Sequence, residues 1–160
     1  MVKSGTKWYE VEGGVLHMFM GEYSHSVDAK GRLIMPAKFR EQLGTEFVVT
    51  KGLDGCLFVY PMEEWQNIEA KFREVPLTTK DARKFSRFFF AGAASLELDK
   101  QGRILLPAVL REYAEVQKDV VLVGVLNRIE IWDKNRWEDS NSYDDMDEIA
   151  EHMADLGLSI

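Results

Sequence analysis

The sequence predicts an α+β fold assembled from two tandem copies of one unit. Residues 28–40 (DAKGRLIMPAKFR) and 99–111 (DKQGRILLPAVLR) share Asp, Gly, Arg, Pro, Ala and a closing Arg at a constant offset of 71 residues. Residues 48–60 correspond to residues 120–132 at an offset of 72, so the similarity continues beyond the motif. Self-similarity at a fixed spacing indicates a repeated architecture. Each copy should therefore contribute the same strands and helices.

The length of 160 residues suits one domain, or two small units that share a core. A half of roughly 70 residues would bury little apolar surface alone, because the buried fraction falls with chain length. We therefore expect the halves to fold against each other. The hydrophobic fraction of 46% is that of a globular protein, and the sequence lacks the run of about 18 apolar residues that predicts a membrane span.

The first copy begins with alternating residues 19–28, which are expected to form a strand with Tyr23 and His25 on one face. Residues 28–31 read as a tight turn, because Asp can accept hydrogen bonds from backbone N–H groups two residues on and Gly tolerates positive φ. A short strand over 33–35 follows. Pro36 favours a helix start, and that helix should run to Leu43.

Residues 47–51 and 56–60 are β-rich and flank a Gly-rich turn, so they predict a hairpin. A helix is expected between Pro61 and Pro76, with the apolar stripe Trp65, Ile68, Phe72 and Val75. A second helix over 79–91 should be capped by Thr78 or Thr79, with Phe88, Phe89 and Phe90 in the core or a subunit contact.

The second copy should repeat this order of strand, turn, strand, helix and hairpin. We place the first repeat at 18–78, a connecting basic and aromatic helix at 79–91, and the second repeat at 92–138. Residues 1–17 precede the similarity and are expected to be a tag or an upstream extension. Residues 139–160 form an acidic tail, with a short helix through Ile149, Met153 and Leu156.

The net charge of −7 is unevenly distributed. Residues 133–160 contain nine acids against Lys134 and Arg136, so this segment accounts for the whole net charge. Residues 28–40 contain four basic residues against one acid. Because local charge decides partner choice more than the total does, a nucleic-acid partner remains compatible with the acidic composition.

The two Asp-x-x-Gly-Arg turns are the main candidate site. The planar fork of Arg32 or Arg103 matches phosphate oxygens and the major-groove edge of guanine, and an adjacent Gly allows close backbone approach. The alternative is structural: Asp28 pairs with Arg32, and Asp99 with Arg103, to stiffen the turns.

Arg40 and Arg111 lie eight residues after these arginines. They either join the basic surface or cap helix carbonyls. The basic side chains of the helix over 79–91 are expected to form a solvated face. They are Lys80, Arg83, Lys84 and Arg87.

Catalytic and metal-binding chemistry finds little support in the sequence. The histidines at 17, 25 and 152 lack metal-binding spacing, and none of the common hydrolase or nucleotide-binding motifs occurs. Cys56 is the single cysteine, which excludes an intramolecular disulfide and a Cys-based metal cluster. Its position in a predicted strand indicates a buried, inert thiol. We expect no enzyme activity, no metal and no cofactor, and a reducing cytoplasm as the location.

Several stretches together closely resemble one bacterial family. They are Met18–Tyr23, the turns Asp28–Arg32 and Asp99–Arg103, Pro36–Arg40 and Phe88–Gly92. These are similar to the MraZ family of transcriptional regulators of the division and cell wall gene cluster, which is related to the swapped-hairpin AbrB and SpoVT DNA-binding fold. The similarity covers about residues 18–156.

The resemblance implies two AbrB-like halves in one chain that form a pseudo-dimer with a barrel-like core and flanking helices. It also implies assembly into homo-oligomeric rings and binding to direct repeats in double-stranded promoter DNA at the nucleoid, with repression as the expected outcome. No membrane and no small-molecule substrate are implied. The DNA-binding residues carried over are Asp28, Lys30, Gly31, Arg32, Asp99, Lys100, Gly102 and Arg103, with Lys38, Arg40 and Arg111 as supporting residues.

A competing hypothesis is an antitoxin-like or scaffold protein of the same fold. Such a protein would bind a protein partner through its acidic C-terminal segment. Nucleic acid that accompanies the purified protein would favour the DNA-binding function, and a stoichiometric basic partner would favour the alternative.

Overall fold

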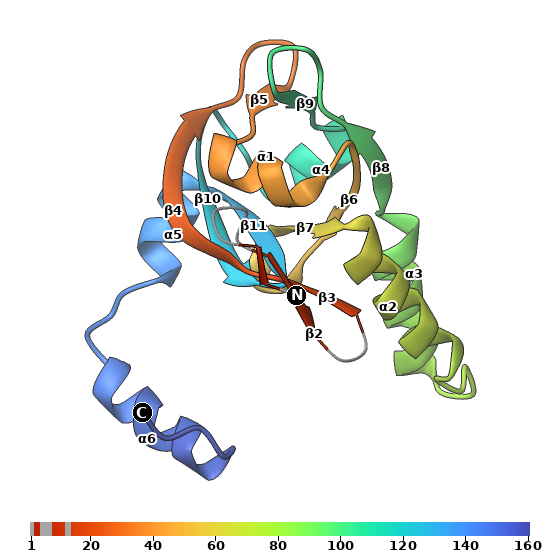
Figure 1. Ribbon diagram of the computed structural model, residues 1–160, viewed down its shortest axis with the longest axis vertical. Coiled ribbons are helices and arrows are strands. Elements are labelled where there is room, and N and C mark those ends of the chain that lie inside the picture. Colours follow the sequence, from red (N-terminus) through yellow and green to blue (C-terminus); the bar gives the residue numbers. More distant parts are fainter. Residues whose placement is uncertain (1, 4–7, 12–13) are drawn as a thin grey trace.

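The computed structural model describes residues 2–3, 8–11 and 14–160, and the strands of these residues form three sheets. The largest is a curled, antiparallel six-stranded sheet with the order β4–β10–β11–β7–β6–β8 (Figure 1). Its strands are β4 (Phe19–Ser26), β6 (Glu46–Lys51), β7 (Leu57–Pro61), β8 (Ala94–Glu97), β10 (Asp119–Leu126) and β11 (Arg128–Asp133).

The two repeats exchange strands in this sheet. Strand β4 of the first repeat pairs with β10 of the second, from Phe19 opposite Leu126 to Ser26 opposite Asp119. Strand β8 of the second repeat pairs in turn with β6 of the first. The strand order is thus the same from either edge when equivalent strands are exchanged, which places a pseudo-twofold axis between β11 and β7. Neither repeat has a complete sheet alone, so the expectation of a shared core is confirmed.

The chain passes from β4 through a turn into β5 (Arg32–Ile34) and then into α1 (Ala37–Leu43). The equivalent elements of the second repeat are β9 (Arg103–Leu105) and α4 (Ala108–Tyr113). Pro36 and Pro107 immediately precede the helices with φ of −52° and −57°, which suits a helix start. The predicted strand, turn, strand and helix are therefore all present.

The main core lies inside the curled sheet, against α1 and α4 (Figure 1). Both repeats contribute to it. Its fully enclosed side chains include Phe19, Leu33, Phe39, Phe47, Leu57, Ile104, Leu106, Leu110, Leu122, Ile129 and Ile131.

A second apolar cluster lies where the hairpin of α2 (Met62–Arg73) and α3 (Lys80–Ala91) meets the sheet. Phe89 is buried there, with Phe88 and Phe90 packed around it, as predicted. Thr79 caps α3 by accepting a hydrogen bond from the backbone of Ala82. The predicted stripe on α2 is wrong at Val75, because the helix ends at Arg73 and leaves Val75 43% exposed.

The predicted hairpin β6–β7 is present, with a 3-10 turn at Leu53–Gly55. Cys56 lies just before β7 rather than within it, and is fully buried. Burial raises the pKa of its thiol to about 12, so it stays protonated and inert at neutral pH.

After β11 the chain forms α5 (Lys134–Ser140), which packs on β10 and β11. It then forms α6 (Met146–Asp155), the short helix expected in the tail. Figure 1 shows α6 set apart from the sheet and from the other helices. Among the described residues, no helix is long and apolar enough to cross a membrane.

The predicted extension, residues 1–17, lies partly outside the described residues. The described part forms a small antiparallel sheet of β1 (Val2–Lys3), β2 (Trp8–Val11) and β3 (Gly14–His17). His17 is joined to the body of the protein through a contact of 3.4 Å between its Nδ1 and Oε1 of Glu64 on α2.

Candidate nucleic-acid interface

The turn at residues 28–32 is organised around the carboxylate of Asp28. Its Oδ1 accepts hydrogen bonds of 2.9 Å from the backbone N–H groups of Lys30 and Arg32. Its Oδ2 accepts a 2.7 Å hydrogen bond from Nε of Arg32. Gly31 has a φ of 86°, a conformation that costs glycine nothing and that side chains disfavour. One carboxylate thus holds both the turn and the arginine.

The turn at residues 99–103 repeats this arrangement. Oδ1 of Asp99 accepts from the backbone N–H groups of Gln101 and Arg103, and Oδ2 accepts a 2.8 Å hydrogen bond from Nε of Arg103. The structural ion pairs are therefore present in both copies. Since only Nε is used, both Nη nitrogens of Arg32 and Arg103 lack a hydrogen-bond partner within the described chain. The ion pair therefore orients each guanidinium and leaves its two Nη nitrogens available to a ligand.

Both carboxylates are held in their charged form. The hydrogen bond from the backbone N–H of Arg32 is the largest effect that lowers the pKa of Asp28, and the Arg32 side chain adds to it. Arg103 lowers the pKa of Asp99 in the same way. The two ion pairs are consequently intact at neutral pH.

The strands that follow the turns form a two-stranded antiparallel ribbon, β5–β9. Leu33 lies opposite Ile104, and both side chains are fully buried. Residues opposite each other in a sheet, and residues two apart along a strand, share a face. The other face therefore carries Arg32 opposite Leu105, and Arg103 opposite Ile34.

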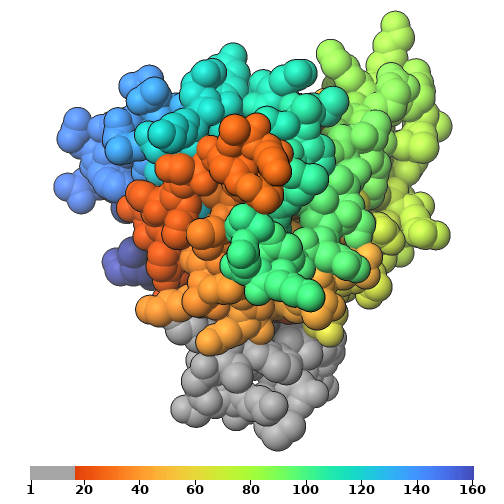
Figure 2. Space-filling model, turned by 90° about the horizontal axis from the view of Figure 1, so that it is seen from above, coloured from red at the N-terminus to blue at the C-terminus, as the bar shows by residue number. Residues whose placement is uncertain are grey.

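The two turns are joined into one tip. The backbone N–H of Met35 donates to the carbonyl of Gly102, and the N–H of Leu106 donates to the carbonyl of Gly31, each at 2.9 Å. Seen from above in Figure 2, the segment near residue 30 (orange-red) and the segment near residue 100 (green) lie side by side. The sequence-predicted arginines of both repeats thus reach the same surface.

Arg40 and Arg111 do not cap the carbonyls at the ends of their own helices, which was one of the two alternatives left by the sequence. Each half-buried guanidinium lies against the turn of the other repeat, Arg40 at Gly102 and Arg111 at Gly31. Nε of Arg111 donates to the carbonyl of Leu106 at 3.1 Å. Nε of Arg40 is buried without a hydrogen-bond partner in the described part of the chain. Both arginines support the tip from beneath.

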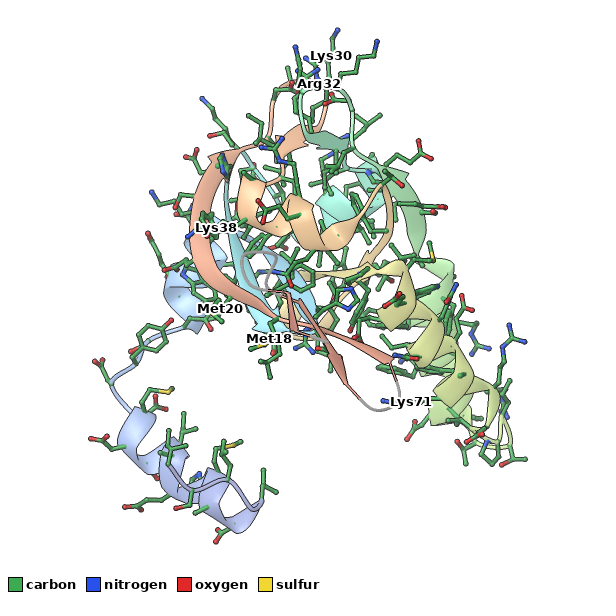
Figure 3. All side chains as sticks on the ribbon, in the orientation of Figure 1. Met18, Met20, Lys30, Arg32, Lys38 and Lys71 are labelled. Carbon is green, nitrogen blue, oxygen red and sulfur yellow. The ribbon has the colours of Figure 1, made fainter. Side chains whose placement is uncertain are left out.

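The three lysines expected to contact DNA do not all lie at the tip. Lys30 and Lys100 are exposed on the two turns, and Figure 3 shows Lys30 beside Arg32 at the end of the molecule. Lys38 is exposed on α1 and lies away from the tip in the same view. The structure therefore brings Lys30 to the arginines and leaves Lys38 on the flank.

Sequence reasoning missed the apolar residues of the ribbon. Ile34 is 44% exposed and Leu105 is 57% exposed, and they occupy equivalent positions at the offset of 71. Alternation along the short strand could have identified them, because their neighbours Leu33 and Ile104 point inward. The arginines are thus accompanied by two outward aliphatic side chains.

Metal chemistry finds no support at the tip or elsewhere in the described residues, where no group of three or more His, Cys, Asp or Glu side chains is placed to hold a metal ion.

Comparison with known proteins identifies the family. A model of the family described as "MraZ protein, putative antitoxin-like" matches residues 18–88 and again 89–157. The chain belongs to the MraZ family. Its two-unit organisation corresponds to the two successive matches, and the MraZ fold is AbrB-like.

Individual MraZ relatives cover nearly all of the matched region. The chain is 61% identical to the transcriptional regulator MraZ of Thermoanaerobacter sp. (strain X514) over 143 residues, which are 88% of this chain and 100% of the relative. Identity is 63% over 142 residues with the transcriptional regulator MraZ of Lachnoclostridium phytofermentans, or 89% of this chain and 99% of the relative. It is 61% over 143 residues with that of Acetivibrio thermocellus, at 88% and 100% coverage. The chain is therefore a member of a family of transcriptional regulators.

Proposed function

We propose that this protein is a transcriptional repressor that binds direct repeats in double-stranded DNA upstream of the division and cell wall gene cluster. The observation that carries the proposal is the outward face of the β5–β9 ribbon, where Arg32 and Arg103 stand beside Ile34 and Leu105. It acts in the cytoplasm, at the nucleoid, without catalysis, cofactor or small-molecule substrate.

The dimensions and chemistry of the ribbon fit duplex DNA. The major groove admits a two-stranded β-ribbon, an arginine fork matches the O6 and N7 atoms of guanine, and aliphatic side chains contact the methyl group of thymine. Lys30 and Lys100 on the adjacent turns would contact phosphates, which supply affinity and its salt dependence. Asp28 and Asp99 orient the arginines before DNA arrives, which lowers the entropic cost of binding.

Direct repeats in the operator require neighbouring binding units of the same orientation. A homo-oligomeric ring meets this requirement, because its subunits follow one another head to tail. Several weakly binding tips on one ring would also reinforce each other by multivalency.

The test is fluorescence anisotropy with a duplex from the upstream region of the gene cluster. Arg32→Ala and Arg103→Ala should each weaken binding by about 1–3 kcal/mol, the value of a bidentate arginine–guanine contact. The matched control is Lys134→Ala, because Lys134 is an exposed lysine on α5, which packs on β10 and β11 and not on the ribbon. Parent-like affinity in both arginine variants would falsify the proposed mechanism.

A second candidate function is binding of a protein partner, as expected for an antitoxin-like protein. The acidic, partly apolar surface of α6 favours it. Co-purification distinguishes the two functions: a basic protein in stoichiometric amount would support the second, and accompanying nucleic acid the first.

A further inference from the structure

Helix α6 presents an apolar stripe that no other described part of the chain covers. Met146, Ile149, Met153 and Leu156 are spaced three or four residues apart, so they share one face. Their exposed fractions lie between 36% and 79%. The acids of the helix occupy the opposite face; they are Asp147, Glu148, Glu151 and Asp155. All residues from 142 to 160 are exposed.

A helix of this length requires a packing partner. α6 has 10 residues, whereas isolated helices shorter than about 12–15 residues are marginal in water, and most helical stability in proteins comes from burial of an apolar face. The sharply divided surface of α6 therefore has the character of a docking surface.

The pseudo-twofold axis explains why this helix lacks a partner within its own repeat. α2 and α5 are equivalent, so α6 follows α5 as α3 follows α2. In the first repeat Phe72 of α2 packs on Phe85 and Phe90 of α3, with ring centroids 5.8 and 4.7 Å apart. α5 has only seven residues, and its Trp137 packs inward on Trp132 at 5.6 Å. Trp137 is consequently not available to α6 in the way that Phe72 is available to α3.

The α2–α3 hairpin carries a complementary groove. It is lined by Glu69, Phe72, Arg73, Leu77, Ser86 and Phe90, and its surface is mostly apolar. Leu77 is 55% exposed at the hairpin end. The groove thus offers apolar contacts to a helix that lacks them.

The charges of the two surfaces are opposite. Residues 71–91 contain six basic residues against two acids, a net charge of +4. Residues 139–160 contain seven acids and no Lys or Arg, a net charge of −7. Charge complementarity of this kind steers association and fixes orientation.

The arrangement of the two surfaces favours another copy of the chain as the occupant of the groove. α6 and the α2–α3 hairpin lie on opposite sides of the sheet in both views (Figures 1 and 2). Residues 141–145 link α5 to α6, and five residues span at most about 17 Å. This short linker holds α6 on the α5 side of the sheet, away from the groove of the same copy (Figure 1).

We propose that α6 of one copy docks in the α2–α3 groove of the next. A donor surface on one side and an acceptor on the other make a head-to-tail contact, which generates a ring when the rotation closes. This inference rests on the self-association proposed above and is independent of DNA binding.

The test uses two full-length variants with different defects and measures mass by light scattering. Ile149→Asp combined with Met153→Asp disables the donor helix and leaves the groove intact. Leu77→Asp disables the groove and leaves the helix intact. The matched control is Leu53→Asp, because Leu53 is 54% exposed in the turn between β6 and β7 and belongs neither to the groove lining nor to α6.

The parent and the Leu53→Asp control are expected to form the same oligomer, and each defective variant alone to be a monomer. An equimolar mixture of the two defective variants should contain a species of twice the monomer mass, since one intact helix meets one intact groove. Misfolding cannot produce this complementation. Parent-like oligomers from either variant, or a purely monomeric mixture, would overturn the docking proposal while leaving the ring intact. A monomeric parent would overturn the ring as well, and DNA binding is measured separately by anisotropy.

Discussion

Arg111 of the second repeat lies against Gly31 of the first, with its Cζ 3.0 Å from the position that a Cβ on Gly31 would occupy. Arg40 and Gly102 form the reciprocal contact. Each arginine-bearing turn is therefore supported by the helix of the other repeat. Residues of both repeats thus build each turn region, although 71 residues separate the two turns in the sequence.

Gly31→Ala should destabilise the protein, because φ at this position is 86° and the new methyl group meets the Arg111 guanidinium. The conformational cost is about 1–2 kcal/mol, and the steric clash adds to it. In an Arg111→Ala background the clash disappears, so the cost of Gly31→Ala should fall toward the conformational part alone. Urea unfolding of the double-mutant cycle measures the difference. Arg40 contacts Gly102 instead, so the effects of Gly31→Ala and Arg40→Ala on the free energy of unfolding should add. Equal coupling energies in the two cycles would contradict a specific contact between Arg111 and Gly31.

Lys30→Ala should lower the salt dependence of DNA binding. A phosphate contact contributes about 0.9 to the slope of log K against log salt concentration, so the slope should decrease by about that amount. Anisotropy titrations over a range of salt concentrations give the slope. Lys134→Ala on α5 should leave the slope unchanged, and an unchanged slope in Lys30→Ala would remove Lys30 from the interface.

Arg32→Ala should cost more DNA affinity than Arg103→Ala. The first copy of the motif, residues 28–40, is the more basic, with four basic residues against three in residues 99–111, because Lys38 has no basic counterpart. The Arg32 side chain is also the more exposed of the two, at 33% against 25%. Parallel titrations of both variants on one duplex make the comparison, and the reverse order would show that the second turn dominates.

The Asp28 and Asp99 carboxyls should titrate below the ordinary value of 3.8, since hydrogen bonds from Arg32 and Arg103 lower their pKa. A lowered folded-state pKa means that the stabilisation is complete above the unfolded-state pKa and is lost as the pH falls through the folded-state pKa. The turns should therefore be insensitive to pH from 5 to 8 and should open in stronger acid. Carbon NMR of the side-chain carboxyls measures both titrations. Arg32→Ala should raise the pKa of Asp28 and leave that of Asp99 unchanged, and a common response of both would contradict independent ion pairs.

Leu33→Ala should cost about 2–5 kcal/mol, because truncation of a fully buried leucine leaves a cavity. Leu33 lies opposite Ile104 of the other repeat, and the sheet is shared. The protein should therefore still unfold in one transition at a lower denaturant concentration, with fluorescence and far-UV circular dichroism coincident. Two separate transitions would show that the repeats fold independently.

Local sequence signals determined most of the secondary structure. The Asp-x-x-Gly-Arg turns, the helix starts after Pro36 and Pro107, and the Thr79 cap all depend on residues within a few positions of each other. Such short-range interactions can be predicted from the sequence alone. The exception is Val75, where the backbone left the helix two residues before Val75 and the apolar spacing gave no sign of it.

The sequence by itself determined that the chain contains one unit twice, and through its motifs the family and the two arginine turns. Only the tertiary structure decided that Arg40 and Arg111 support the turns from across the pseudo-twofold axis, that Ile34 and Leu105 join the arginines on one face, and that α6 remains without a partner. The physical reason is that periodicity specifies which face of an element is apolar, but not which distant element will cover it. In this fold the covering element belongs to the other repeat, and for α6 we infer that it belongs to another copy.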